Sequence, residues 1–369
     1  MEDKLKELVE GNNEKNRKKW ALEWKDQGKK VIGTISSCVP EEVIYAAGML
    51  PWAVTGTWQE STPLANVHRP SNTCSFCTHV LESLLAGDLD FLDGTVIADI
   101  DQDLVRLADV WASVERIPFF LMINFPQMNS ELAYQFLSKE MKKFIEALED
   151  FSGTKVTDDS LRHAVETYNE MRTLLAKVYE LRKKETPPLS GAEVLGITTT
   201  ARVMPADRFN QALKELLPWL ENRKTALSHF NPRVLVSSDM LDDPAYLFLI
   251  EGEGCLIAMD DLDNGSRYFM RLVDPSSPDI LYSIAKRYIS RHSFPRMGYW
   301  REQSQQVIDW VKEYNIDGVV ELALTSCWPR MWRTQFFKKH INDAGIPHIM
   351  IEKEYHFAGA GQMRTRIGA

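Results

Sequence analysis

Short apolar runs that alternate with helical segments constrain the fold of this chain more than any other feature. In the first third of the sequence, the expected strands are 30–35, 52–56, 94–99 and 119–123. Helices are expected between them at 40–47 and 79–85. This alternation is typical of a parallel, doubly wound sheet. The same rhythm returns near the C-terminus, with expected strands at 233–238, 255–260, 318–326 and 347–354.

The segment between the two series has a different pattern. Its apolar residues recur at helical spacing, with charged residues on the opposite face, which predicts packing helices or a subunit interface. We therefore predict an α/β fold with two doubly wound parallel-sheet domains, Rossmann-like or flavodoxin-like, and a helical segment between them. The expected regions are an N-terminal helix at 1–29, a first α/β domain at 30–130, the helical segment at 131–229 and a second α/β domain at 230–369.

Composition excludes several classes of protein. The chain has 369 residues, 44% of them hydrophobic, which is enough for two cores. Its net charge of −9 argues against a nucleic-acid partner. Its apolar runs are far shorter than the roughly 18 residues of a membrane span, and the charged N-terminus does not resemble a signal peptide. We therefore expect no membrane association and a cytoplasmic protein.

Three of the five cysteines lie where a predicted strand leads into a helix. Cys38 follows the strand at 30–35, Cys74 precedes the helix at 79–85, and Cys327 ends the strand at 318–326. Ligands of open parallel sheets bind at this edge. A helix N-terminus also stabilises a thiolate and lowers its pKa. The sequence therefore predicts that Cys38, Cys74 and Cys327 are available as ligands of a metal centre.

The other two cysteines have different expected roles. Cys255 begins a strand at the opposite edge, and we expect it in the core, where free cysteines are common. Cys77 completes a C-x-x-C with Cys74, and its role stays open between ligand, neighbouring thiol and packing residue, with a non-ligand role favoured. Zinc held by Cys74, Cys77 and His79 would lack the usual second pair of ligands. A thioredoxin-like redox pair would lack its surrounding pattern.

Phosphate-binding and hydrolase signatures are absent from the sequence. No G-x-S-x-G, G-x-x-x-x-G-K or G-x-G-x-x-G occurs. We therefore do not expect this chain to hydrolyse ATP itself.

Several stretches together point to a known family. The stretch VIGTISSCVPEEVIYAAGMLPWAVTG at 31–56 resembles the opening of 2-hydroxyacyl-CoA dehydratase and class I benzoyl-CoA reductase subunits. Further matches are TCSFCTHVLESLLAGDLDFLDG, PPLSGAE, MDDLDNGSRYF, AKRY, DGVVELALTSC and GQMRTRI. The resemblance implies a four-iron four-sulfur (4Fe-4S) cluster held by three cysteines, here Cys38, Cys74 and Cys327. One iron would stay open to a non-cysteine ligand or to substrate.

The chain departs from the family pattern at two positions. Some benzoyl-CoA-reductase-type subunits have their first cysteine two residues earlier, where this chain has Ser36, and this difference bears on the assignment of Cys38. They also have a cysteine where this chain has Asp263, which indicates that the 260–267 loop supplies no cluster ligand here.

The resemblance also implies an activity and partners. It implies an acyl-CoA substrate, a homologous second subunit, and a separate ATP-dependent iron–sulfur activator that supplies single electrons. A ketyl-type radical would then lose a hydroxyl group or undergo ring reduction. The C-x-F-C spacing and the nearby tryptophans favour benzoyl-CoA-type ring reduction. The alternatives are a 2-hydroxyacyl-CoA dehydratase subunit and a non-catalytic electron-relay or structural subunit.

A few other residues are candidates for the site. Glu41 and Glu42 are first-turn helix charges that lie close enough to Cys38 to act as acids or hydrogen-bond partners. Arg267 is a candidate for a CoA phosphate or carboxylate, with a salt bridge as the alternative. Trp52 and Trp328, with Trp58 and Trp332, are expected either to wall a dry substrate pocket or to pack in the core.

Overall fold

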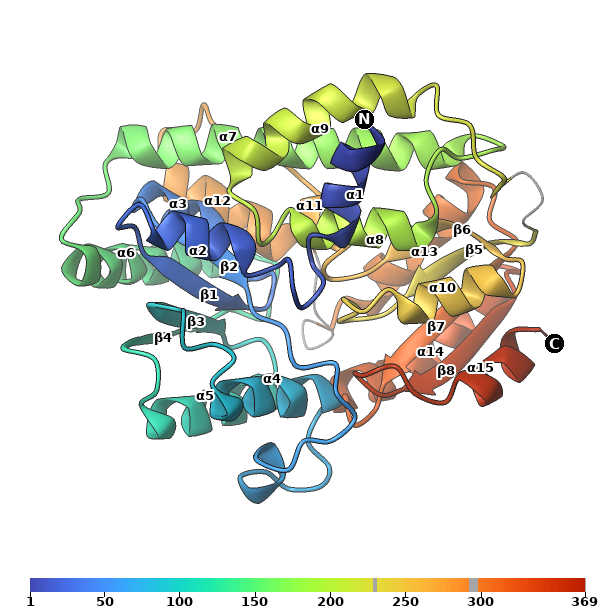
Figure 1. Ribbon diagram of the computed structural model, residues 1–369, viewed down its shortest axis with the longest axis horizontal. Helices are drawn as coiled ribbons and strands as arrows, with labels where there is room; N and C mark the ends of the chain where they lie inside the picture. Colours follow the sequence, from blue (N-terminus) through green and yellow to red (C-terminus); the bar gives the residue numbers. More distant parts are fainter. Residues whose placement is uncertain (228–230, 292–297, 369) are drawn as a thin grey trace.

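Two four-stranded, all-parallel sheets lie at opposite ends of the molecule, with a layer of helices running across both (Figure 1). This computed structural model describes residues 1–227, 231–291 and 298–368. The first sheet has the order β2-β1-β3-β4, and the second has the equivalent order β6-β5-β7-β8. The predicted fold class is therefore confirmed.

The strands lie close to their predicted positions. Those of the first sheet are β1 (Val31–Ile35), β2 (Leu50–Ala53), β3 (Gly94–Ala98) and β4 (Phe119–Ile123). Those of the second sheet are β5 (Arg233–Ser237), β6 (Leu256–Asp261), β7 (Gly318–Leu324) and β8 (His348–Lys353). The central strands β1 and β3 are buried along their whole length, as expected for a parallel sheet covered on both faces.

Strand β2 begins and ends earlier than the expected 52–56. Leu50 pairs with Val31 and Ala53 pairs with Thr34, so the sheet register ends the strand at Ala53. The chain then turns away towards Gly56, which lies directly against His79 of the next long helix, where an added Cβ would come within 2.5 Å of the His79 Cβ. Tertiary packing thus sets this boundary.

Helices connect the strands in both halves. The helices of the first half are α3 (Glu41–Ala46), α4 (Ser75–Ala86) and α5 (Gln102–Val114), with a short 3-10 turn, η1 (Ala65–Val67). Those of the second half are α10 (Ala245–Gly252), α11 (Ser266–Phe269), α12 (Ile280–Ser290), α13 (Trp300–Glu313), α14 (Trp328–Asp343) and α15 (Ala360–Ile367). Each sheet therefore has helices on its faces, as in doubly wound folds.

The helical segment is present as predicted. It contains α6 (Glu131–Ser152), α7 (Asp158–Glu180), the turn η2 (Leu181–Lys183), α8 (Gly191–Thr200) and α9 (Ala206–Leu220). Ser130, Thr157 and Ser190 cap the first, second and third of these α-helices through their hydroxyl groups. Helix α8 is buried on nearly all sides, so its sequence shows little of the helical periodicity that identifies the others.

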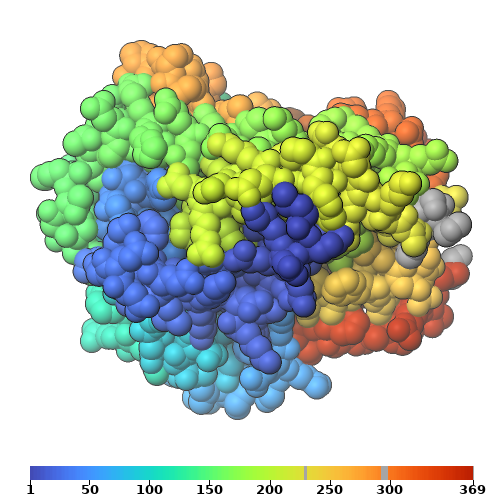
Figure 2. Space-filling view, turned by 45° about the horizontal axis from the view of Figure 1, so that its top comes forward, coloured from blue at the N-terminus to red at the C-terminus, as the bar shows by residue number. Residues whose placement is uncertain are grey.

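The two halves share one core. Helix α12 follows the second sheet's β6 in sequence, but it packs against α6 and α7. Buried residues from both halves belong to the same hydrophobic cluster, and Figure 2 shows the later helical segment, in yellow-green, running across one face from the first half to the second. The expected domain limits stay predictions, and the limit at 229/230 lies at residues outside the described ranges.

The N-terminal region differs from the single expected helix. Two helices form, α1 (Glu2–Glu10) and α2 (Lys19–Lys25), and the residues from Gly11 to Lys18 form turns. Gly11 lies so close to Trp20 and Thr200 that a Cβ there would clash. The chain breaks at this close approach because glycine and asparagine are weak helix formers. In the described part of the chain, no helix is both long and apolar enough to span a membrane.

Candidate functional site

A small cavity of about 70 Å³ lies where the carboxyl ends of strands from both sheets meet. Its thiol groups come from Cys74, Cys77 and Cys327. Its oxygen atoms come from Ser36, Asp101, Asp239 and Asp263. Apolar side chains such as Phe76, Ile100, Leu104, Met240 and Leu324 complete the wall. We call this the cysteine cavity. Its place at the strand ends is where the topology of open parallel sheets predicts a ligand site.

Cys74 and Cys327 reach the cysteine cavity from opposite halves of the chain. Cys74 is the N-cap residue of α4, and Cys327 is the N-cap residue of α14, which has Pro329 in its first turn. The backbone N–H of Ser75 donates to the carbonyl of Thr325 at 3.2 Å, which holds the two loops together. The structure thus brings together two of the three predicted cysteine ligands.

Cys77 lies one helical turn after Cys74, so both thiols face the same side of α4. An interaction with Cys327 lowers the pKa of the Cys74 thiol. Contact with Cys77 and burial outweigh this effect and raise the pKa of Cys74 well above its usual value. Contact with Cys74 and burial likewise raise the pKa of Cys327. None of the chain's cysteines is joined in a disulfide, and these three form one group.

Cys38, the third predicted ligand, does not line the cysteine cavity. Ser36 does, two residues earlier in the same loop. Ser36 has a φ of +89°, which turns the chain sharply after β1, and its Oγ accepts from the Cys38 backbone N–H at 3.0 Å. Cys38 itself is fully buried, and its Sγ accepts from the Arg291 guanidinium at 3.5 Å.

The carboxylates of the cysteine cavity have unequal environments. Burial raises the pKa of Asp101 to about 6, although backbone N–H groups at the start of α5 oppose this shift. Burial also acts on Asp239, but Arg330, Arg333 and Arg267 outweigh it and lower its pKa. Asp263 accepts from the Ser37 hydroxyl at 2.6 Å, which ties the β6 loop to the β1 loop.

A buried lysine lies near the thiols. Lys353, at the end of β8, is buried, and burial lowers its pKa to about 8 against the attraction of Asp242 and Asp243. The charge of Cys74 also acts on it. A positive charge at this place would offset part of the negative charge of ionised thiols or of an anionic cluster.

Glu41 and Glu42 lie in the core on the other side of the β1 loop. Glu42 pairs with Arg172 of α7 and accepts from the Tyr288 hydroxyl of α12 at 2.7 Å. Glu41 accepts from the hydroxyl of Tyr268 at 2.6 Å. Neither carboxylate lines the cysteine cavity. Their contacts fasten α3 to α7 of the helical segment and to α11 and α12 of the second half. The expected acid role stays a prediction.

The tryptophans are also absent from the wall of the cysteine cavity. Trp52 is buried, with the Arg17 guanidinium 4.3 Å from its ring and its indole N–H donating to the Arg17 carbonyl. Trp328 is 48% exposed and Trp332 is 75% exposed, so they do not enclose a dry pocket. A substrate contact by Trp52 or Trp328 stays a prediction. Cys255 is buried in the smaller core cluster.

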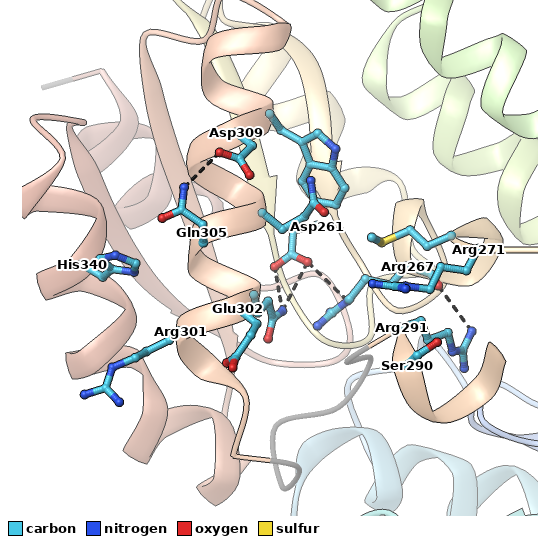
Figure 3. A pocket seen from close by; sticks show the side chains of 14 residues that line it. Asp261, Arg267, Arg271, Ser290, Arg291, Arg301, Glu302, Gln305, Asp309 and His340 are labelled. Atoms are coloured by element: carbon cyan, nitrogen blue, oxygen red, sulfur yellow. Dashed lines mark hydrogen bonds and ion pairs between the residues drawn. The ribbon is translucent and has the colours of Figure 1, made fainter. Parts of the chain in front are cut away.

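A second, larger cavity of about 480 Å³ lies beside α13. Among the described residues, four arginines line it, namely Arg267, Arg271, Arg291 and Arg301. Figure 3 shows Arg267 and Arg271 extending from one side towards α13, which carries Glu302, Gln305 and Asp309. We call this the arginine cavity. Sequence analysis identified Arg267 but not the cavity, because its other residues come from distant segments.

Arg267 lies between the two cavities. Its guanidinium donates to the Ser238 carbonyl and lies 3.5 Å from Asp239, whose other oxygen is 3.8 Å from the Cys327 thiol. On the side of the arginine cavity it lies 3.5 Å from Asp261. Within the described part of the chain, its Nη1 has no hydrogen-bond partner. A charge bound in the arginine cavity would therefore act on the cysteine loops through Arg267 and Asp239.

The donor set of the cysteine cavity suits an iron–sulfur cluster. Its three thiols are buried, two are at helix N-termini, and its other walls are mostly apolar. In the described ranges, no three His, Cys, Asp or Glu side chains converge as ligands of a single metal ion. His79, part of the zinc alternative, is held by the Thr57 carbonyl at 2.9 Å and faces His356. Zinc therefore has no support among these residues.

Comparison with known proteins identifies the family. The family model described as 2-hydroxyglutaryl-CoA dehydratase, D-component, matches residues 36–369. The chain belongs to this family. The predicted resemblance is thus confirmed, and the chain is of the kind that forms subunits of acyl-CoA dehydratases and reductases.

Individual relatives match over nearly their whole length. The beta subunit of (R)-phenyllactyl-CoA dehydratase from Clostridium sporogenes is 28% identical, covering 99% of this chain and 96% of the relative. One of the subunits of benzoyl-CoA reductase from Thauera aromatica is 26% identical, covering 93% of this chain and 90% of the relative. The beta subunit of (R)-2-hydroxyglutaryl-CoA dehydratase from Acidaminococcus fermentans is 27% identical, covering 94% of this chain and 93% of the relative.

Proposed function

We propose that this chain is the cluster-bearing subunit of an oxygen-sensitive enzyme that removes water from a 2-hydroxyacyl-CoA. The observation that carries the proposal is the meeting of Cys74 and Cys327, from opposite sheets, at one buried cavity. Because the chain belongs to this family, we interpret the two thiols as ligands of an iron–sulfur cluster. The cluster, when bound, supplies single-electron transfer and a Lewis-acidic iron.

Dehydration is preferred here over the ring reduction that the sequence favours. The phenyllactyl-CoA dehydratase subunit exceeds the benzoyl-CoA reductase subunit in both identity and coverage. The tryptophans that favoured an aromatic ring do not line the cysteine cavity. A 2-hydroxyacyl-CoA that carries an aromatic ring, like the one in the name of the phenyllactyl enzyme, is consistent with the similarity to the dehydratase subunit. It is also consistent with the similarity to the benzoyl-CoA reductase subunit. Benzoyl-CoA-type reduction stays the second candidate.

The chain's own residues would hold and screen the cluster. Cys74 and Cys327 are proposed as ligands, with a third thiol from Cys38, as the sequence predicts, or from Cys77. The apolar wall excludes water, which strengthens every charge interaction inside. Lys353 places a buried positive charge near Cys74.

The CoA part of the substrate has a proposed place in the arginine cavity. Its volume lies in the range of small-molecule sites. Arginine forks bind phosphate oxygens well, and the N-terminal residues of α13 also line the cavity. Of the carboxylates there, Asp261 already accepts from Gln303 at 3.0 Å and Asp309 from Gln305 at 2.9 Å. This proposal gives Arg267 its predicted role at a CoA phosphate.

The partners implied by the family are part of the proposal. The two dehydratase relatives are named as beta subunits, which supports a complex with a homologous second subunit. A separate ATP-dependent iron–sulfur activator would supply the electron, since the sequence has no phosphate-binding loop of its own.

The test is a reconstituted reaction. The chain, its second subunit, the activator, ATP and a reductant are mixed anaerobically with either (R)-phenyllactyl-CoA or benzoyl-CoA. Formation of the enoyl-CoA from the first, without a dienoyl product from the second, is expected. Reduction of benzoyl-CoA without any dehydration would overturn the proposed reaction.

A further inference from the structure

We propose that Cys77, and not Cys38, supplies the third thiol of the cluster site, so that the ligand set is Cys74, Cys77 and Cys327. The inference rests on the proposed function, because it assigns ligands to the cluster that this function requires. It departs from the sequence prediction of Cys38.

The position of Cys77 favours it as the third ligand. Cys77 lines the cysteine cavity together with Cys74 and Cys327, and its thiol interacts with that of Cys74. The spacing C-x-x-C places two thiols on one helical face, and the same spacing recurs in cluster-binding segments of ferredoxins. These three thiols surround one space.

Cys38 is engaged by contacts away from the cysteine cavity. Its Sγ accepts from Nη2 of Arg291, and the same nitrogen donates to the hydroxyl of Ser37 at 2.8 Å and to the Ser37 carbonyl. Arg291 in turn lines the arginine cavity. A Cys38 thiol that moved to the cysteine cavity would have to leave its contact with Arg291. Cys38 is therefore held on the arginine side of the loop.

Beyond its three thiols, the wall of the cysteine cavity supplies oxygen atoms as polar groups. Ser36 presents the β1 loop to the cysteine cavity, and Asp101, Asp239 and Asp263 add carboxylate oxygens to the same wall. Apart from the three thiols, the wall is mostly apolar, and its polar groups are these oxygen atoms. They would therefore be the non-thiol donors available to a cluster held by the three thiols.

The experiment measures iron and sulfide in anaerobically reconstituted Cys77→Ala and Cys38→Ala variants, with Cys255→Ala as the matched control for loss of a buried thiol. Circular dichroism and thermal unfolding of the metal-free proteins show which variants fold. We expect Cys77→Ala to lose most of its iron and its visible charge-transfer absorption, and Cys38→Ala and Cys255→Ala to keep both. A folded Cys77→Ala that keeps its cluster would overturn the inference.

Two further outcomes separate this inference from the proposed function. If Cys38→Ala loses the cluster and Cys77→Ala keeps it, the ligand assignment is wrong and the proposed function stands. If the wild-type chain takes up no cluster at all, the proposed function fails. If Cys77→Ala does not fold, Cys77→Ser replaces it. Retained iron with an altered electron paramagnetic resonance spectrum would then support Cys77 as a ligand, and an unchanged spectrum would count against it.

Discussion

The Sγ of Cys327 lies 3.8 Å from Oδ2 of Asp239, and this carboxylate also faces Arg267, Arg330 and Arg333. The ends of β7 and β5 are thereby joined at the wall of the cysteine cavity. Three arginines depend on one carboxylate for much of their charge compensation, although Arg330 also pairs with Glu321. A change at Asp239 would therefore affect both the stability of this wall and the electrostatic environment of the Cys327 thiol.

Replacing Asp239 should be costly for this reason. In Asp239→Asn, the buried arginines lose a counter-charge, and we expect the free energy of unfolding to fall by about 3 kcal/mol. Denaturant unfolding of the metal-free chain measures the loss. The control, Asp343→Asn, removes an exposed partner of Lys339 and should cost less than about 1 kcal/mol. Equal stability of the two variants would contradict the role given to Asp239.

Glu42 is expected to act mainly on stability. Its carboxylate is completely buried against Arg172 and Tyr288, and Arg172 lowers its pKa despite burial. Glu42→Gln leaves the Arg172 charge without its partner, so we expect a loss of about 3 kcal/mol in the free energy of unfolding. Assays normalised to folded, cluster-loaded protein should show little change in turnover. A normal stability with abolished turnover would instead support the acid role predicted from sequence.

Glu251 should make the stability of the chain depend on pH. Burial raises its pKa to about 7, although N–H groups of Gly191 and Ala192 oppose this shift. The folded chain binds the proton of the Glu251 carboxyl group more tightly than the unfolded chain does. The contribution of this group to the free energy of unfolding is therefore fully present below about pH 4.5 and is lost as the pH rises through about 7. Glu251→Gln stays uncharged throughout.

The free energy of unfolding of Glu251→Gln should therefore increasingly exceed that of wild type as the pH rises from about 5 to about 8. The difference should reach up to about 3 kcal/mol. Denaturant unfolding at several pH values measures it. The exposed neighbour Glu253, changed to Gln, is the control and should show no such trend. A pH-independent difference between Glu251→Gln and wild type would contradict the shifted pKa.

Arg271 tests the proposed CoA site. It is exposed and lines the arginine cavity, so Arg271→Gln should leave folding intact. We expect it to weaken CoA binding by about threefold to tenfold, which corresponds to roughly 1 kcal/mol. Isothermal titration calorimetry with CoA, pantetheine and pyrophosphate measures this. Arg106→Gln, at an exposed arginine of α5 paired with Asp109, is the control. Equal CoA affinity in both variants would argue against this cavity.

Sequence reasoning located the fold and two of the cavity cysteines for a definite physical reason. The alternation of strands and helices places Cys74 and Cys327 at helix N-termini, and the topology of parallel sheets brings those ends together. The position of Cys38 could not be predicted in this way. It depends on the positive φ of Ser36 and on Arg291, which is distant in sequence.

Other differences have the same origin in tertiary contacts. Glu41 and Glu42 follow the usual pattern of first-turn helix charges, and only the fold shows that arginines and tyrosines from α7, α11, α12 and the turn after α8 surround them. The arginine cavity could not be predicted because its residues come from β6, from α11 to α14 and from the residues that directly follow α11 and α12. The close approach of Gly11 to Thr200 of α8, which leaves no room for a side chain there, is likewise a tertiary contact.

The most direct test of the account is the iron and acid-labile sulfide content of the anaerobically purified chain, with its Mössbauer spectrum, beside a Cys74→Ala/Cys327→Ala double variant. We predict about four irons and about four sulfides per wild-type chain, in the form of one cubane cluster. The double variant should hold almost none while Cys255→Ala holds the wild-type amount. A colourless wild-type chain, or a double variant that keeps its cluster, would contradict the account.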